Sequence, residues 1–148
     1  MLTLDKELAT AKRFNRDLSV LAVDIDYFKK INDQFGHAVG DIVIETLSRN
    51  IQSHISKEML FARMGGEEFV ILAEDSDEKA LLQWVESLRA SIEKLEVPVE
   101  NGILHFSVSC GVARHCRECK TIDALLDRAD QALYEAKENG RNRVIFRV

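Results

Sequence analysis

The chain has 148 residues, of which 46% are apolar and 30% charged, and its formal net charge is −5. The length fits one domain with a substantial core, and the composition is typical of a globular protein. The negative charge argues against nucleic acid as a partner, because such binding rests on cations that neutralise phosphates. No apolar run approaches the ~18 residues of a membrane span. We therefore expect a cytoplasmic domain without membrane contact of its own, even within a membrane-anchored longer protein.

The first part of the chain predicts a helix, a strand and two further helices. Residues 4–15 carry one apolar stripe at helical spacing. A continuous apolar run predicts a strand over residues 19–24 that is buried on both faces. A short helix is expected over residues 27–35, closed by Gly36, and a longer one over residues 41–55. The side chains expected to face inward from the longer helix are Ile42, Ile44, Leu47, Ile51 and Ile55.

A turn with two adjacent acidic residues follows. Apolar runs flank the pair Gly65-Gly66, which favours a β-hairpin because glycine adopts the positive φ of a tight turn without steric penalty. The turn then displays Glu67 and Glu68. Adjacent carboxylates repel each other, so a metal cation is the expected neighbour. The flanking strands are expected over residues 59–62 and 69–72.

The rest of the chain predicts two helices and two strands. These are a helix over residues 77–95, a strand over 104–113, a helix over 122–139 and a strand over 143–148. Asp77 and Thr121 are the expected helix caps, and Gly140 ends the last helix. The side chains expected to face inward are Ala80, Leu81, Trp84, Leu88 and Ile92 from the first of these helices, and Phe106, Val108, Cys110 and Val112 from the strand before the last helix. The element order predicts an α+β, ferredoxin-like fold with a mainly antiparallel five-stranded sheet flanked by helices.

A second acidic corner lies at the end of the first strand. Asp24 and Asp26 are two residues apart, and in a strand such residues can share a face. The helix that begins near Tyr27 presents free backbone N–H groups and a partial positive charge, which suit a phosphate. Carboxylates for a hard cation beside a helix start for an anion predict a site for a metal and a nucleotide.

Three segments carry a resemblance to a known family. Residues 24–41 read DIDYFKKINDQFGHAVGD, residues 63–69 read RMGGEEF, and residues 129–143 contain ADQALYEAK and GRNR. With these motifs in this order, the chain from about Leu18 to Phe146 resembles the GGDEF family of diguanylate cyclases, which make cyclic di-GMP from two GTP molecules. The resemblance implies a sandwich like that of the nucleotidyl cyclases.

The resemblance assigns metal and catalytic roles to the acidic residues. Asp24, Glu67 and the backbone carbonyl of Ile25 match the ligands of Mg²⁺, with Mn²⁺ as a possible substitute. Glu68 matches the residue implicated in activating the attacking 3′-hydroxyl, so Glu67 and Glu68 are the expected catalytic residues. The alternative is a surface aspartate and a turn glutamate without a ligand.

The resemblance also assigns the guanine contacts. Asn32 and Asp41 match the family's guanine-reading residues. A carboxylate accepts hydrogen bonds from guanine N1–H and the N2 amino group, an edge that adenine lacks. Asp41 therefore favours GTP over ATP. An alternative is that Asp41 caps the helix that follows Gly40.

The expected phosphate contacts are Phe28, Lys29, Lys137 and Arg141, with the Phe28 side chain in the core. Lys137 and Arg141 would share one helical turn if the helix extended past Gly140. Lys30 is expected to be a solvated surface charge. Arg63 is expected to pair with a nearby carboxylate.

The implied reaction joins two GTP molecules and releases pyrophosphate, and it implies a homodimer because each domain holds one GTP. The alternative is a non-catalytic GTP-binding signalling module that regulates a partner. We expect residues 1–148 to form a single catalytic domain that lacks the family's N-terminal segment and the upstream sensor domain that usually provides dimerisation. Residues 56–59, Ser-Lys-Glu-Met, replace the R-x-x-D product-inhibition motif, so we expect no inhibition through that primary site.

The three cysteines give a weak signal. Cys110 is expected in the core of a strand. Cys116 and Cys119 have C-x-x-C spacing in an expected loop, but a zinc or redox site needs further partners. We expect reduced surface thiols at these two positions.

Overall fold

The computed structural model describes residues 18–74, 77–114 and 122–147. The helix expected over residues 4–15, the Thr121 cap and the pair Cys116 and Cys119 lie outside these residues. No helix in the described part of the chain is both long and apolar enough to cross a membrane.

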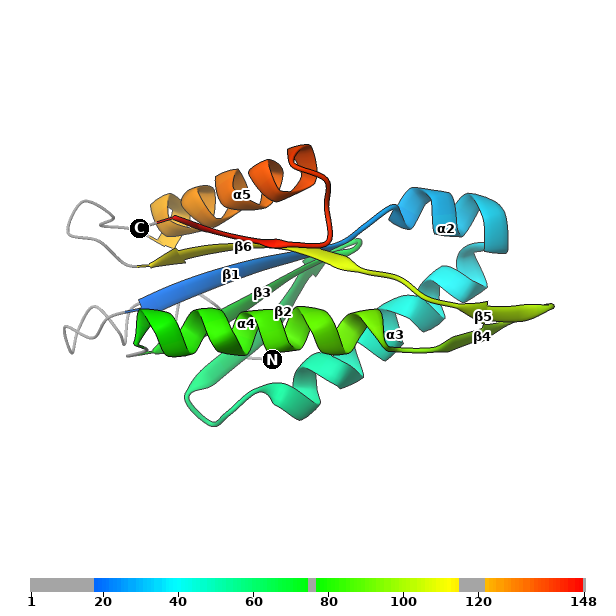
Figure 1. The fold of residues 1–148 in the computed structure, drawn as a ribbon, viewed down its shortest axis with the longest axis horizontal. Coiled ribbons are helices and arrows are strands. Elements are labelled where there is room, and N and C mark those ends of the chain that lie inside the picture. The colour runs from blue at the N-terminus through cyan, green and yellow to red at the C-terminus, as the bar shows by residue number, and fades with distance from the viewer. Residues whose placement is uncertain (1–17, 75–76, 115–121, 148) are drawn as a thin grey trace.

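A five-stranded sheet forms the centre of the molecule (Figure 1). Its strands are β1 (Leu18–Ile25), β2 (Met59–Gly65), β3 (Glu68–Glu74), β6 (Val108–Arg114) and β7 (Val144–Arg147), in the spatial order β2-β3-β1-β6-β7. All neighbouring strands are antiparallel except the parallel pair β6 and β7. Every residue of the central strand β1 is buried, as its unbroken apolar run predicts. The expected fold class is therefore confirmed.

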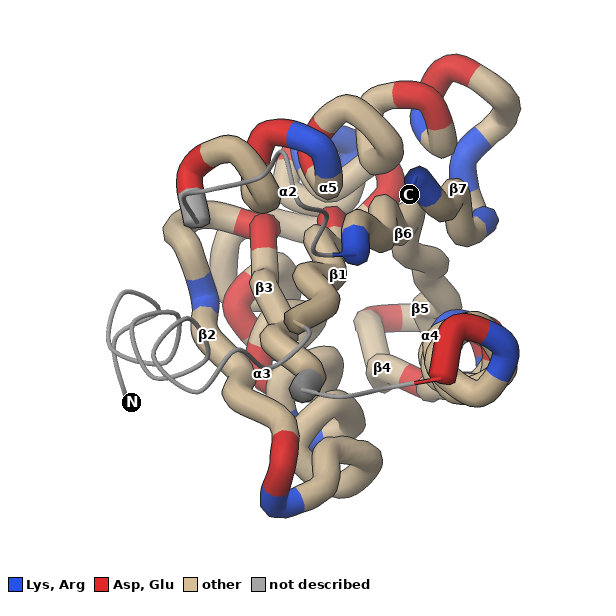
Figure 2. Tube along the Cα trace, turned by 90° about the vertical axis from the view of Figure 1, so that its left-hand side faces the viewer, with Lys and Arg blue, Asp and Glu red and all other residues tan. Residues whose placement is uncertain are grey.

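Helices cover both faces of the sheet. They are α2 (Phe28–Phe35), α3 (His37–His54), α4 (Glu78–Glu93) and α5 (Ile122–Glu138). In Figure 1, α5 lies on one face while α3 and α4 lie on the other. Asp77 caps α4 as predicted, because its carboxylate accepts a hydrogen bond from the Ala80 backbone N–H at 3.3 Å. In Figure 2, acidic and basic residues lie close together along α4 and α5, and most of the sheet is uncharged.

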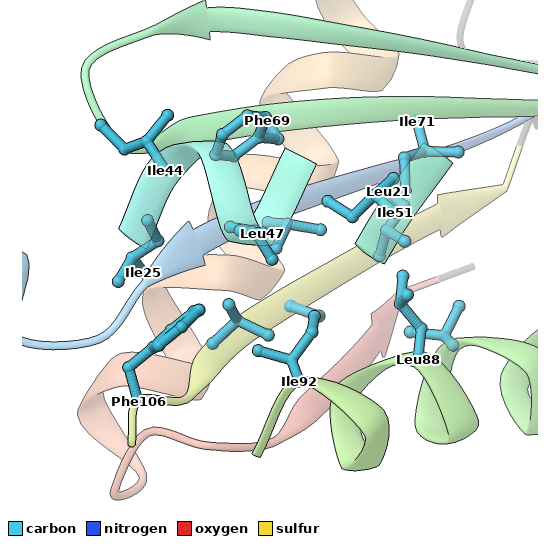
Figure 3. Packing of buried hydrophobic residues seen from close by; sticks show 14 of the residues in the cluster. Leu21, Ile25, Ile44, Leu47, Ile51, Phe69, Ile71, Leu88, Ile92 and Phe106 are labelled. Atoms are coloured by element: carbon cyan, nitrogen blue, oxygen red, sulfur yellow. The ribbon is translucent and has the colours of Figure 1, made fainter. Parts of the chain in front are cut away.

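The larger core lies between the sheet and the helices α3 and α4 (Figure 3). Side chains from β1 and β3 meet side chains from both helices there. The residues labelled in Figure 3 are Leu21, Ile25, Ile44, Leu47, Ile51, Phe69, Ile71, Leu88, Ile92 and Phe106. Cys110 is fully buried in the same core, and this burial raises the pKa of its thiol. A smaller cluster, which includes Leu125 and Ala129, joins α5 to the opposite face.

The prediction for α3 was wrong at its start and on its inward face. The helix begins at His37 instead of Asp41, because Gly36 adopts a φ of 91° and ends α2 while it starts α3. Asp41 therefore lies inside the helix and does not cap it. Ile42 is 44% exposed, and its neighbour Val43 is buried instead.

Two further predictions need correction. The strand expected from residue 104 begins at Val108, and a separate two-stranded ribbon, β4 (Val97–Val99) and β5 (Gly102–Leu104), precedes it. A turn at Asn101, where φ is 71°, connects the two short strands. On α4, Ala80 is exposed and Val85 is buried, so the apolar stripe is shifted from the predicted one.

The hairpin between β2 and β3 forms where the glycine pair predicts it. Gly65 and Gly66 have φ values of 124° and 54°, which a residue with a Cβ rarely adopts. The Arg63 guanidinium donates a hydrogen bond from Nε to the Gly66 carbonyl at 2.9 Å. Arg63 thus contacts the backbone of the turn and not, as was expected, a carboxylate. This hydrogen bond closes the tip that carries Glu67.

Candidate active site at the end of β1

The end of β1 and the hairpin tip bring the predicted acidic residues together. Asp24 on β1 is directly opposite Glu68 on β3. The Ile25 backbone N–H donates to the Glu67 carbonyl at 3.4 Å, which joins the strand end to the tip. From α5, the ammonium of Lys137 forms an ion pair with the buried carboxylate of Asp24. Residues from three distant parts of the sequence thus meet at one corner.

The carboxylates at this corner disfavour each other's charge. Burial raises the pKa of Asp24, and the charges of Glu67 and Asp26 add to this, while Lys137 acts in the opposite direction. Burial also raises the pKa of Glu68 to about 7, together with the charge of Asp130 and a hydrogen bond shared with it. One ammonium therefore does not neutralise the negative charge that the fold gathers here.

The donor set at this corner fits a hard cation. Carboxylate and carbonyl oxygens are what Mg²⁺ prefers, and Asp24, Glu67 and Ile25 offer both kinds. Among the described residues, no three His, Cys, Asp or Glu side chains converge into a complete metal site. Mg²⁺ commonly takes one or two protein carboxylates and fills its remaining positions with water and substrate phosphates.

Asp26 does not share the role of Asp24. It is 3% exposed, and its carboxylate accepts hydrogen bonds from the hydroxyls of Ser107 at 2.6 Å and Ser109 at 2.5 Å. It also accepts one from the backbone N–H of Asn142 at 3.0 Å. A carboxylate occupied by three donors is a structural anchor, and it links β1 to β6 and to the turn after α5.

The two predicted guanine-reading residues lie where α2 packs on α3, Asn32 against Gly40 and Asp41 next to Gly40 in the sequence. A Cβ placed on Gly40 would clash with Oδ1 of Asn32 and lie 3.3 Å from Cζ of Phe28, so both side chains rest on this glycine. Asp41, the next residue, is exposed beside them. Oδ1 of Asn32 is buried and has no hydrogen-bond partner among the described residues. Since an unpaired buried acceptor is costly, this oxygen suits a donor supplied by a ligand.

Three cations surround the start of α2. Tyr27 precedes the helix with a φ of 56°, and no described side chain caps the helix, so its first N–H groups stay free. The Arg141 guanidinium lies 4.7 Å from the centre of the Tyr27 ring, and the Lys30 ammonium lies 4.8 Å from it. Lys29 is exposed in the first turn. Lys30 is exposed, as predicted, and its ammonium also lies over the aromatic face of Tyr27.

Arg141 reaches this site from beyond the end of α5. The helix stops at Glu138, Gly140 has a φ of 118°, and the Arg141 N–H donates to the Ala136 carbonyl at 2.9 Å. This closure is a common way for a helix to end. The helix does not extend past Gly140, and the turn that replaces it brings Arg141 over Tyr27.

Two residues at this site carry no role in the sequence prediction. Asp130 shares a hydrogen bond with Glu68, and it is seven residues before Lys137 on α5. That spacing is two helical turns and places both on one face, so helical periodicity alone could have identified Asp130. Asn142 binds Asp26 across a long sequence separation, and no local pattern indicates this contact.

Comparisons with known proteins agree with this geometry. The family model described as "Diguanylate cyclase, GGDEF domain" matches residues 1–143. The chain is 39% identical over 127 residues to diguanylate cyclase A of Treponema denticola, a match that covers 86% of this chain and 34% of that protein. The chain thus spans about a third of the length of this curated relative.

Solved structures show the same fold. The active GGEEF domain of a diguanylate cyclase from Vibrio cholerae is similar with a TM-score of 0.86 and 38% identity, over 96% of this chain and 90% of that one. The GGDEF domain of DgcB from Caulobacter crescentus, in complex with c-di-GMP, is similar with a TM-score of 0.89 and 30% identity, over 97% and 85% of the two chains. On the family match and these likenesses, the chain belongs to the GGDEF domain family of diguanylate cyclases.

Proposed function

We propose that this chain is the catalytic domain of a diguanylate cyclase, which condenses two GTP molecules into cyclic di-GMP and releases pyrophosphate. The observation that carries the proposal is the pairing of Glu68 with Asp24 beside Lys137 at the end of β1. Such an arrangement supports metal-assisted phosphoryl transfer. The names of the relatives, which are diguanylate cyclases, support the same conclusion.

The nucleotide is proposed to lie along α2, from the guanine site to the acidic corner. Asn32 and Asp41 would bind the guanine edge, with the unpartnered Oδ1 of Asn32 accepting from it. An eight-residue helix is about 12 Å long, so a single nucleotide can reach from one end to the other. The triphosphate would contact the backbone of Phe28, where the first turn begins, and the side chains of Lys29, Lys137 and Arg141.

Asp24, Glu67 and the Ile25 carbonyl would hold Mg²⁺, or Mn²⁺ in its place, and this cation would neutralise charge that develops on the phosphates. Glu68 acts as the general base in this proposal. A pKa of about 7 places it near the ambient pH, where a base accepts a proton efficiently. It takes the proton of the 3′-hydroxyl, whose oxygen attacks the α-phosphorus of the second GTP while pyrophosphate leaves.

Two domains are needed because the proposal gives each domain one nucleotide site. We propose a homodimer in which the two sites face each other, so that dimerisation controls the proximity of the reactants. Since the relatives are about three times longer, we further propose that a sensor or dimerisation domain accompanies this one in a longer protein. Because the substrate GTP is available in the cytoplasm, we also propose that the domain lies there.

Product inhibition is proposed to differ from that of relatives with an R-x-x-D motif. Ser56, exposed before β2, occupies the position of the motif's arginine, and Met59 occupies that of its aspartate. Neither offers the planar pair of donors with which a guanidinium binds. We propose that cyclic di-GMP does not inhibit this domain through that primary site.

The test is turnover by the domain fused to a dimeric coiled coil, with GTP and Mg²⁺, followed by chromatography. Cyclic di-GMP should form, and Glu68→Gln should lower its rate by at least about 100-fold, as for loss of a general base. Glu100→Gln, in the exposed turn between β4 and β5, is the matched control. GTP binding without any product from the unaltered domain would instead support a non-catalytic signalling module.

A further inference from the structure

The turn that carries Arg141 adopts an unfavourable backbone conformation. Arg141 and Asn142 have φ values of 64° and 48°. Residues with a Cβ are uncommon in this region, although asparagine tolerates it better than arginine. The conformation persists only if contacts elsewhere hold the turn.

Asn142 supplies these contacts through both its backbone and its side chain. Its backbone N–H donates to the buried carboxylate of Asp26 at 3.0 Å. Its Nδ2 donates to Oε2 of Glu93 at 2.8 Å, and its Oδ1 accepts from Nη1 of Arg89 at 2.6 Å. Arg89 and Glu93 also pair with each other at 2.7 Å. The side chain thus joins both members of an ion pair at the C-terminal end of α4.

Hydrogen bonds, more than packing, hold Asn142 in place. The residue lines a cleft of about 320 Å³ between α2 and the end of α4, together with Asp26, Tyr27 and Glu93. Close packing does not surround a side chain that borders such a cleft. The hydrogen bond from Asn142 lowers the pKa of Glu93, as does Arg89, so Glu93 stays ionised as an acceptor.

We propose that Asn142 is a positioning residue for Arg141, and that through it the end of α4 sets the affinity of the site for nucleotide phosphates. The anchors of Asn142 fix the turn. Arg141, the residue before Asn142 in this turn, therefore holds its guanidinium over Tyr27 at the start of α2. A change at Glu93 alters phosphate binding although Glu93 is 48 residues away from Arg141 in sequence. This inference rests on the proposed function, in which Arg141 contacts the triphosphate.

The sharpest variant is Asn142→Gly. Glycine adopts a φ of 48° freely, so this change removes the side-chain anchors without straining the backbone. The affinity of this variant for GTP, measured by calorimetry with Mg²⁺, should fall about 3- to 30-fold, which lies within the range of coupling between neighbouring residues. Its affinity for guanosine, which has no phosphate, should stay within about twofold. A merely structural role would lower both affinities alike.

A second variant leaves the residues of the turn itself unchanged. Glu93→Ala should give the same selective loss for GTP, and in an Arg141→Ala background neither change should have a further effect. Glu135→Gln, which removes an exposed ion pair with Arg147, is the control and should leave both affinities unchanged. If the unaltered domain binds GTP, and Asn142→Gly and Glu93→Ala bind it as tightly as the unaltered domain does, the positioning role is wrong while the proposed function stands. If the unaltered domain binds no GTP, the proposed function and the inference are both wrong.

Discussion

Replacing Glu68 by glutamine should stabilise the metal-free domain at pH 8, although it removes the proposed base. Burial and Asp130 raise the pKa of Glu68 from 4.5 to about 7 in the folded protein. A raised pKa means that the folded state binds the proton more tightly than the unfolded state. Stability from this group is thus complete below about pH 4.5 and is lost as the pH rises through about 7. Glutamine carries no charge at any pH and avoids this loss.

The expected magnitude follows from the same two pKa values. Each unit of difference between the two pKa values corresponds to about 1.36 kcal/mol. The free energy of unfolding that glutamine can add above pH 7 therefore has an upper bound of about 3 kcal/mol. Solvent screens the partly exposed side chain and Asp130 shares the proton, so we expect about 1–2 kcal/mol. For a domain of this size that corresponds to a rise in Tm of roughly 3–6 °C.

The assay is thermal unfolding followed by circular dichroism, with EDTA present, from pH 5 to pH 8.5. The difference in Tm between Glu68→Gln and the unaltered domain should be small or negative at pH 5 and should grow to its full positive value above pH 7. Glu100→Gln, in an exposed turn, should give a difference that does not vary with pH. A Glu68→Gln domain that is less stable than the unaltered one at pH 8 would refute the reasoning.

Three further substitutions test other parts of the site and fold. Gly40→Ala should lower GTP affinity at least about tenfold in calorimetry because its methyl group would displace Asn32; unchanged affinity would count against the guanine assignment. Asp41→Asn should narrow the preference for GTP over ATP in a competition assay, and an intact preference would contradict its role. Gly111→Ala should destabilise the domain by about 3 kcal/mol or more in urea, because its Cβ would overlap the Ala129 carbonyl of α5; a loss below about 1 kcal/mol would show that α5 can move away.

The sheet and the acidic corner could be predicted because their signals are local. The apolar run of β1 indicates a strand buried on both faces, and the glycine pair indicates the hairpin that carries Glu67. The family motifs assign Asp24 and Glu68 to one site. The structure then pairs these two residues across neighbouring strands, which neither strand pattern alone specifies.

Other features depend on contacts between distant segments. The start of α3 was missed because Gly36 serves both as the end of α2 and the start of α3. A glycine that ends one helix looks the same in the sequence whether or not it also starts the next helix. The binding of Asn142 to Asp26, 116 residues away, reflects packing of the last turn on β1 and β6, and a single sequence contains no signal for such a pair.

The most direct test of the account is turnover of GTP by the coiled-coil dimer, with Glu67→Gln and Glu68→Gln measured in parallel. The account predicts cyclic di-GMP and pyrophosphate from the unaltered dimer and at least about a 100-fold loss in each variant, with folding retained. Product formation at an undiminished rate by the Glu68→Gln dimer would contradict the assignment of the base. Complete absence of product from a folded, GTP-bound, unaltered dimer would contradict the proposed reaction itself.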